Sequence, residues 1–358
     1  MSEIVFILGA GASKEAGAPV IADFLDKAEE LLKSGKSDKY KEDFERVFDA
    51  RSKLPAVHSK AQLDLDNIES IFATLEMGRL VNRLPNIESA SIKPLLVSIR
   101  RLIVKTLEQT ISYPVRGRRL LPGNSYHQFA SLIKDLVAKG HACSIITFNY
   151  DYALDYALNF NGIAADYCLS ETKKEGVIPL IKLHGSLNWA RCPKCGDIIP
   201  WYIKDYMARI NPMVLDETIN EYVYLGIGAQ LHKSGIKHCG TDVEPDPVIV
   251  PPTWDKTEYH QALSEVWGRA ASELSTATNI FVSGYSLSET DLFFRYLFAL
   301  GSVGQALIKR FWVFDPDMSN VVNERFRNLI GPQIKARYLY VVNNFSGMVQ
   351  SIRQEFQT

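Results

Sequence analysis

The stretch IVFILGAGASKEAGAP, residues 4–19, decides the fold class of this chain. Its first five residues are a continuous apolar run rich in β-branched side chains, which is typical of a strand buried on both faces of a sheet. Gly9 and Gly11 follow at once, and Ser13 stands where it can cap a helix. A strand, a glycine turn and a helix in this order predict the first βα unit of a parallel sheet, although a tight turn without a ligand explains the glycines as well.

Six further apolar runs repeat this pattern along the chain. Most are continuous rather than alternating, and helical patterns lie between them, so we expect an α/β fold built on a doubly wound parallel sheet. The expected strands are 143–148, 177–183, 247–250, 279–285, 310–315 and 338–342, and the expected helices are 151–159, 257–276, 288–300, 318–328 and 345–356.

Two segments interrupt the alternation. Residues 20–140 show no convincing strand, and their apolar residues recur at helical spacing, so we expect an inserted helical module. Residues 190–246 carry the motifs CPKCG and IKHCG and are expected to form a small cysteine-containing lobe. Because no linker is evident, residues 1–358 are interpreted as a single domain with these two insertions.

The overall composition limits the function classes. The formal net charge is −1, so bulk charge gives no argument for an anionic membrane, and no direct binding of nucleic acid is evident. No run approaches the roughly 18–20 apolar residues of a membrane span. The first apolar run lacks the basic flank of a signal peptide. Five cysteines indicate a reducing compartment rather than a disulfide framework, and we expect a cytoplasmic protein.

Polar side chains follow two expected strands at their carboxyl ends, the edge where open α/β sheets bind ligands. Asn149 and Asp151 follow the first, and an Asn side chain can fix a ribose hydroxyl or a water because it both donates and accepts. Helix capping by either residue is the alternative. His184 ends the second strand, beside Gly185. A single histidine is more often structural than catalytic, and its place at a strand end favours function here.

Two later strands end in similar groups. Gly284 and Ser286 follow the first of them, where a hydroxyl can cap a helix or contact a phosphate. Asp315 ends the second, where a carboxylate can accept hydrogen bonds from ribose hydroxyls. A plain Asp-Pro turn explains Asp315 about as well.

The ordered motifs GAGAS, TFNYD, LHGS with a Cys-x-x-Cys pair, and GYS resemble the sirtuins, and more closely the divergent bacterial members of that family that hydrolyse NAD+ in antiviral defence. The resemblance implies a Rossmann-like NAD+ site and catalytic roles for Asn149, His184 and Asp151. It implies that the residues in contact with NAD+ are Gly9, Ala10, Gly11, Ala12, Ser13, Asn149, Asp151, Gly284, Ser286 and Asp315.

This chain departs from the protein-deacylating sirtuins. Their Pro-Asp-Phe-Arg run corresponds here to APVIADFL, which has no arginine, and their Phe-Gly-Glu segment corresponds to VIVPPTWDK. We therefore expect an NAD+ glycohydrolase with an oxocarbenium-like transition state and His184 as general base.

Two alternatives stay open: an NAD+-dependent deacylase or ADP-ribosyltransferase, and a non-catalytic sensor of an NAD derivative. A defence hydrolase must be silent until triggered. We therefore expect a homo-oligomer or a regulatory partner protein, with the 20–140 module as the candidate contact surface.

A zinc ion is the expected structural metal. Cys192 and Cys195 form one clean Cys-x-x-Cys pair, which is half of a zinc site. Cys239 is the expected third ligand. His232 is the expected fourth, because adjacent residues such as His238 and Cys239 rarely bind one ion together. A remnant that binds no zinc is the alternative.

Overall fold

A parallel sheet forms the centre of the computed structural model, which describes residues 3–59, 62–209, 221–250, 260–288, 292–304 and 306–357. The sheet has seven strands in the order β14-β13-β12-β1-β4-β6-β5. All its strand pairs are parallel, which confirms the predicted fold class. The strands are β1 (Glu3–Leu8), β4 (Ala142–Thr147), β5 (Ala165–Asp166), β6 (Ile178–Lys182), β12 (Asn279–Ser283), β13 (Arg310–Asp315) and β14 (Tyr338–Val342).

β1 lies in the middle of the sheet, and its two neighbours come from distant parts of the chain. At its carboxyl end Leu8 stands beside Thr147 of β4 on one side and Ser283 of β12 on the other. The chain therefore winds outward from β1 in both directions, first through β4 and much later through β12. This reversal creates a topological switch point at the carboxyl end of β1.

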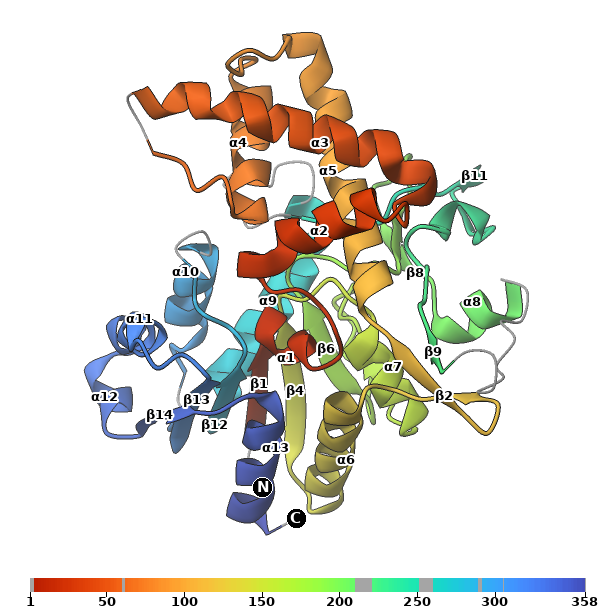
Figure 1. Cartoon of the computed structure of the whole chain (residues 1–358). Helices are drawn as coiled ribbons and strands as arrows, with labels where there is room; N and C mark the ends of the chain where they lie inside the picture. The colour runs from red at the N-terminus through yellow and green to blue at the C-terminus, as the bar shows by residue number, and fades with distance from the viewer. Residues whose placement is uncertain are drawn as a thin grey trace.

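Helices cover both faces of the sheet. Figure 1 shows α6 (Asn124–Ala138) and α13 (Phe345–Phe356) in front of the strands and α9 (His260–Thr276) behind them. Aromatic rings join the front layer to the sheet: Phe129 of α6 lies 5.0 Å from Phe6 and 5.2 Å from Phe345. The other helices of these layers are α1 (Ala10–Lys14), α7 (Ala153–Phe160), α10 (Leu292–Gly301), α11 (Val321–Leu329) and α12 (Pro332–Lys335).

A group of four helices lies over the carboxyl edge of the sheet, in the upper part of Figure 1. α5 packs against the other three members of the group. None of the described helices is both long and apolar enough to cross a membrane. The group consists of α2 (Phe24–Lys33), α3 (Lys41–Lys53), α4 (Ile68–Leu80) and α5 (Ser89–Thr110).

The expectation that residues 20–140 contain no strand is wrong at one place. β2 (Tyr113–Arg116) and β3 (Arg119–Leu120) form a hairpin, and β9 (Tyr222–Val223) pairs with β2 to make a three-stranded antiparallel sheet. The strands are too short for periodicity to reveal them, and β9 comes from a segment about a hundred residues later.

The expected strand 247–250 does not join the central sheet. Ile249 forms an isolated antiparallel bridge with Gly185, and Val250 donates to the carbonyl of His184 at 2.9 Å. The apolar run is buried because it lies along the segment after β6, so burial there does not require a place in the sheet. The start of the helix expected at 257–276 lies partly outside the described residues, as does part of the one at 288–300.

Where it is described, the segment 190–246 contains only short elements. They are β7 (Trp189–Arg191), β8 (Ile198–Pro200), α8 (Ile203–Arg209), the 3-10 helix η4 (Leu231–Lys233), β10 (Lys237–His238) and β11 (Thr241–Asp242), in addition to β9. β7 pairs with β8 and β10 with β11, each antiparallel.

Contact between two backbones holds the loop after β1 against the loop after β12. The Gly11 amide donates to the Gly284 carbonyl at 2.9 Å. Gly284 has a φ of +63°, and a Cβ at this position would lie 2.2 Å from the Ala12 nitrogen. A Cβ on Gly9 would lie 2.5 Å from the Gly284 oxygen. These positions therefore need glycine for loop packing, whether or not a ligand is bound.

We expect Gly284→Ala to lower the free energy of unfolding by about 2 kcal/mol or more, because a left-handed alanine alone costs about 1–2 kcal/mol and the new Cβ clashes with backbone. Chemical denaturation measures this. Gly268→Ala on α9 is the matched control: the position is exposed, nothing lies within 4 Å of an added Cβ, and helix propensity should add up to about 1 kcal/mol. Equal stability of the two variants would contradict the packing role.

Candidate functional site

A pocket opens at the carboxyl end of β1, the switch point of the sheet. Its cavity volume is about 110 Å³, which is smaller than the roughly 300–1,000 Å³ of most small-molecule sites. The loops after β1, β4 and β12 line it, together with an apolar wall from the helical group. That wall consists of Phe24 of α2, Ile68 of α4, and Ile103 and Leu107 of α5.

The pocket gathers most of the residues expected to bind NAD+. Gly11, Ala12 and Asp315 are not part of its lining, and neither is His184. The expected residues that do line it are Gly9, Ala10, Ser13, Asn149, Asp151, Gly284 and Ser286.

Ser13 is the centre of the polar contacts between β1 and β4. Its hydroxyl donates to Asp151 Oδ2 at 2.6 Å and lies 2.7 Å from the hydroxyl of Tyr126. Asn149 donates through Nδ2 to Ser13 Oγ at 3.0 Å. The Ser13 hydroxyl has one proton, which it donates to Asp151, and its side chain is 1% exposed. Ser13 therefore positions Asp151 and Asn149 and does not donate to a phosphate.

Asn149 presents an acceptor to the pocket. Its amide group donates twice, to Ser13 and to the carbonyl of Gly9 at 2.9 Å. Its backbone N–H is held by the Thr147 hydroxyl at 3.1 Å. Within the described residues, no group donates to Asn149 Oδ1. This oxygen can therefore accept a hydrogen bond from a ribose hydroxyl or a water.

Asp151 serves the fold and the pocket at once. Its Oδ1 accepts from the N–H of Ala153, the first residue of α7, at 2.9 Å, so helix capping is one of its roles. The carboxyl group also lines the pocket. Burial raises the pKa of Asp151, while the Lys182 ammonium and the hydrogen bond from Ser13 act against this rise.

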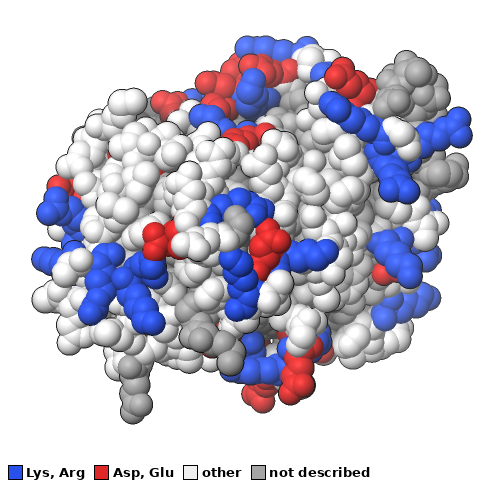
Figure 2. Space-filling view, turned by 90° about the horizontal axis from the view of Figure 1, so that it is seen from below, with Lys and Arg blue, Asp and Glu red and all other residues white. Residues whose placement is uncertain are grey.

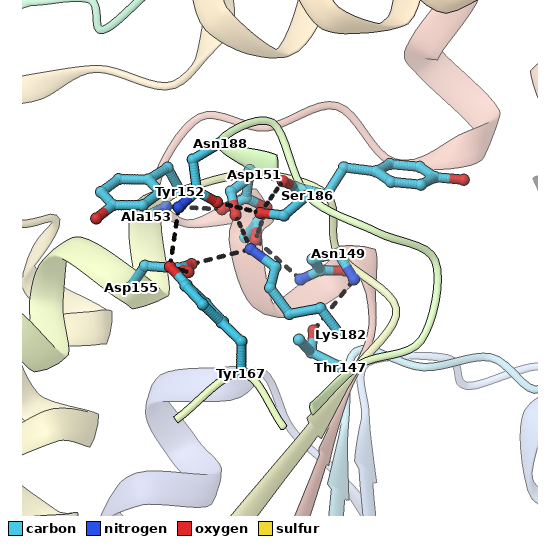
Figure 3. A network of polar contacts seen from close by, with 12 residues as sticks. Thr147, Asn149, Asp151, Tyr152, Ala153, Asp155, Tyr167, Lys182, Ser186 and Asn188 are labelled. Atoms are coloured by element: carbon cyan, nitrogen blue, oxygen red, sulfur yellow. Dashed lines mark hydrogen bonds and ion pairs between the residues drawn. The ribbon is translucent and has the colours of Figure 1, made fainter. Parts of the chain in front are cut away.

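Sequence reasoning missed a buried ionic network beside this loop, drawn in Figure 3. Lys182 of β6 is 1% exposed, and its Nζ donates to Asp155 at 3.0 Å and to the Asp151 carbonyl at 2.6 Å. The Tyr167 hydroxyl donates to the other oxygen of Asp155 at 2.6 Å. A lysine inside the apolar run VIPLIKL was the available signal, because a buried charge requires a partner.

The network continues into the segment after β6. Asn188 donates to the Tyr167 hydroxyl at 3.0 Å and to the Trp201 carbonyl at 3.2 Å, and Ser186 donates to Asn188 Oδ1 at 2.7 Å. Asn188 and Ser186 are fully buried. The polar part of the GSLN motif therefore fastens the end of the sheet to the cysteine-containing lobe.

His184 lies one ring away from the pocket. It is 3% exposed, and its ring stands edge-on to Phe148 at 5.2 Å and 6.0 Å from Tyr150. Both aromatic residues line the pocket. The structure thus places His184 beside the lining residues and not among them, and its catalytic role stays a prediction.

The loop after β1 offers fewer open amides than a phosphate cradle requires. Gly11 donates to Gly284, and Ala12 donates to the carbonyl of Gly9 at 2.9 Å. α1 has only five residues, so its dipole is small. No described residue that lines the pocket is a lysine or an arginine, whereas Glu69 and Asp151 are acidic.

Asp315 adopts the local turn that was the alternative to ribose binding. Its Oδ1 accepts from the Asp317 N–H at 3.0 Å, and the side chain is largely buried. Burial raises the pKa of this carboxyl group. A contact with ribose stays a prediction for this residue.

A second cluster has the chemistry of a zinc site. Cys192, Cys195, His238 and Cys239 each bring one ligand atom within 4.8 Å of the others. His238 Nδ1 is 3.3 Å from Cys195 Sγ and 3.5 Å from Cys239 Sγ. Three thiols and one imidazole fit zinc, which these residues would hold between the turn after β7 and the turn after β10.

The expected fourth ligand, His232, is not part of this cluster, and His238 stands in its place. The objection to adjacent ligands holds for an extended strand, in which neighbours point to opposite faces. Cys239 instead has a φ of +51° and Gly240 a φ of +73°, so both lie in the left-handed turn between β10 and β11. The turn brings the Cys239 thiol back to the side of the His238 ring.

No protein-family model and no curated protein matches this sequence. Among solved structures, Sir2Tm bound to a propionylated peptide is similar at 14% identity over 99% of this chain and 93% of that one, with a TM-score of 0.39. A Sir2 homologue–NAD complex gives 14% identity, 98% and 90% coverage and a TM-score of 0.43. A mutant Sir2 homologue in complex with 2′-O-acetyl ADP-ribose is 15% identical over 99% of this chain and 93% of that one, with a TM-score of 0.44. At these TM-scores the likeness supports no conclusion about activity.

We expect the purified protein to contain about one equivalent of zinc, as in structural sites with four ligands. His238→Ala should lose most of the metal because it removes a ligand, whereas His232→Ala should keep it. Elemental analysis of both variants measures the difference. Zinc retained in His238→Ala, or lost in His232→Ala, would contradict the ligand set.

Lys182→Met should lower the free energy of unfolding by about 3 kcal/mol or more, because it leaves the Asp155 carboxylate buried without its cation. The double variant Lys182→Met/Asp155→Asn should lose less than Lys182→Met alone. Chemical denaturation gives both values. Lys53→Met is the control, since its pair with Asp49 is exposed and should contribute about 0.5 kcal/mol or less. Similar losses for Lys182→Met and Lys53→Met would show that the buried pair has no special role.

Proposed function

We propose that this chain is an NAD+ glycohydrolase, an enzyme that cleaves the bond between nicotinamide and ribose. One observation carries the proposal: Asn149 and Asp151 converge with Gly9, Ala10 and Ser13 on one pocket at the switch point of a parallel sheet. Open α/β sheets bind dinucleotides at this position. The ordered motifs of the sequence support the same ligand.

The electrostatics of the pocket suit the cationic end of NAD+. Nicotinamide leaves as a neutral molecule, so its departure needs no general acid, and positive charge gathers on the ribose in the transition state. Among the described lining residues the charged groups are acidic, namely Glu69 and Asp151. Carboxylates fixed beside a developing cation stabilise it, most of all where apolar walls keep water out.

Asn149 and the helical group would orient the ribose and restrict water. Asn149 lines the pocket, and both hydrogens of its side-chain amide already donate to the protein, which leaves Oδ1 as the acceptor for a ligand. Phe24, Ile103 and Leu107 would cover the other side. Exclusion of bulk water leaves one positioned water as the acceptor of the ribosyl group.

His184 would act as general base only if its ring reaches the pocket past Phe148 and Tyr150. Alternatively, His184 would affect turnover indirectly, as a positioning residue that holds Phe148 and Tyr150 in place. The pH profile separates the two, because loss of a base removes the acidic limb of the profile, whereas loss of positioning lowers the whole curve.

Deacylation or ADP-ribosyl transfer is the second candidate activity, and NAD-derivative sensing without turnover is the third. Most of the segment VIVPPTWDK, on which the departure from deacylases rests, lies outside the described residues. The antiviral role, the homo-oligomer or regulatory partner protein, and the cytoplasmic location also belong to this proposal and are open to test.

The decisive assay incubates the protein with NAD+ and measures nicotinamide by chromatography. We expect release by the wild type, a loss of roughly 10²-fold or more in Asn149→Ala because the ribose is no longer oriented, and a loss of about 10²–10⁴-fold in His184→Ala if it is the base. Asn159→Ala is the control, an exposed asparagine on α7 that should keep full activity.

Because such enzymes are silent before a trigger, the assay includes any co-encoded partner. A folded wild type that releases no nicotinamide in either condition would reject the hydrolase. Release that requires an acylated peptide would instead establish the deacylase.

A further inference from the structure

The small sheet β3-β2-β9 lies apart from the central sheet, and its hairpin projects at the right of Figure 1. Its residues alternate strictly between two faces. The inner face is buried, with Tyr113, Val115, Leu120 and Val223 each at most 9% exposed. The outer face carries arginine and tyrosine side chains instead.

Three arginines meet at the hairpin end of this outer face. Arg116 and Arg119 stand directly opposite each other on β2 and β3, and Arg118 lies in the turn between them. All three are exposed, and within the described part of the chain none of them forms an ion pair. Like charges in directly opposed strand positions destabilise a sheet, so this arrangement needs another reason.

The backbone of the turn between β2 and β3 is also unfavourable for an arginine. Gly117 and Arg118 both have left-handed backbones, with φ of +56° and +58°. Such two-residue turns favour glycine, asparagine or aspartate at both central positions. An arginine is strained there, yet the sequence places a third positive charge at this point.

Two tyrosines extend the same face. Tyr222 is opposite Pro114 in the register of β2 and β9, and Pro114 shares its face with Arg116. Tyr224 follows two residues later. Their side chains are 49% and 46% exposed, although tyrosine normally buries most of its ring. Tyr224 stands just past the carboxyl end of β9, next to Val223.

We propose that the outer face of the β3-β2-β9 sheet binds single-stranded nucleic acid. Arg116, Arg118 and Arg119 would contact phosphates, and Tyr222 and Tyr224 would stack on bases. A flat antiparallel sheet with exposed aromatic rings beside cations is a general solution for holding unpaired bases, since every base offers a face for stacking.

The two exposed tyrosines favour this ligand over an acidic protein segment, because an aromatic ring can stack on the flat face of a base. Figure 2 shows that basic side chains gather in several separate places on the face seen from below, so charge alone singles out no site. The combination with the tyrosines does.

The composition alone gave no sign of this surface. The chain has a net charge of −1, and the arginines and the tyrosines are separated by about a hundred residues of sequence. Only the pairing of β2 with β9 brings them together. The inference does not depend on the reaction proposed for the pocket at β1.

The test is fluorescence anisotropy of the full chain with labelled oligothymidylate and oligouridylate, each about 15 nucleotides long, over roughly 50 to 200 mM salt. Tyr222→Ala should weaken binding about 5- to 100-fold, whereas Tyr222→Phe keeps the ring and should bind like the wild type. Arg116→Ala/Arg119→Ala should lower the slope of log K against log salt by about 1.4, for two phosphate contacts on a single strand.

Arg327→Ala/Lys335→Ala is the matched control, because it removes two exposed charges from another part of the surface. Its binding should be unchanged, and thermal unfolding confirms that every variant is folded. No binding at the lowest salt, equal losses in the two double variants, or equal affinity for a labelled polyglutamate peptide would overturn the proposal. The last result would indicate an acidic protein partner instead.

Discussion

The hydrogen bond from the Ser13 hydroxyl to Asp151 joins the two strand ends on which the pocket depends. Ser13 lies in α1, the helix that follows β1, and Asp151 follows β4, so the bond fixes these two segments relative to each other. Asn149 is held from the same hydroxyl and from the backbone of the first loop. Lys182 then fixes the other side of the Asp151 loop through its carbonyl. The acceptor oxygen of Asn149 is therefore preorganised before any ligand arrives.

This arrangement connects the helical group to the proposed chemistry. Apolar side chains of α2, α4 and α5 complete the wall of the pocket. A partner that shifts these helices would change both access of the ligand and exclusion of water. If the proposed hydrolase is regulated, the helical group is where a partner would act, and the cysteine cluster lies in a separate part of the fold.

The central sheet was predictable because its strands are continuous apolar runs, and such runs report burial directly. The same signal misled at 247–250, where an apolar segment is buried against the end of β6 and not within the sheet. Asn149 and Asp151 were predicted because they follow a strand, and both line the pocket. Lys182 and Asp155 were not predicted: the lysine in the apolar run 177–183 shows that a partner is needed, but only tertiary structure identifies Asp155 as that partner. His238 was set aside because adjacent residues rarely bind one ion, yet the left-handed turn at Cys239 brings both side chains into the cluster.

A crystal structure of the protein soaked with ADP-ribose tests most directly whether this pocket is the dinucleotide site. Its ribose should lie within hydrogen-bond distance of Asn149 Oδ1, with Phe24, Ile103 and Leu107 over it and the Ser13–Asp151 bond unchanged. ADP-ribose bound at any other place, or in this pocket with Asn149 out of reach of both riboses, would contradict the assignment.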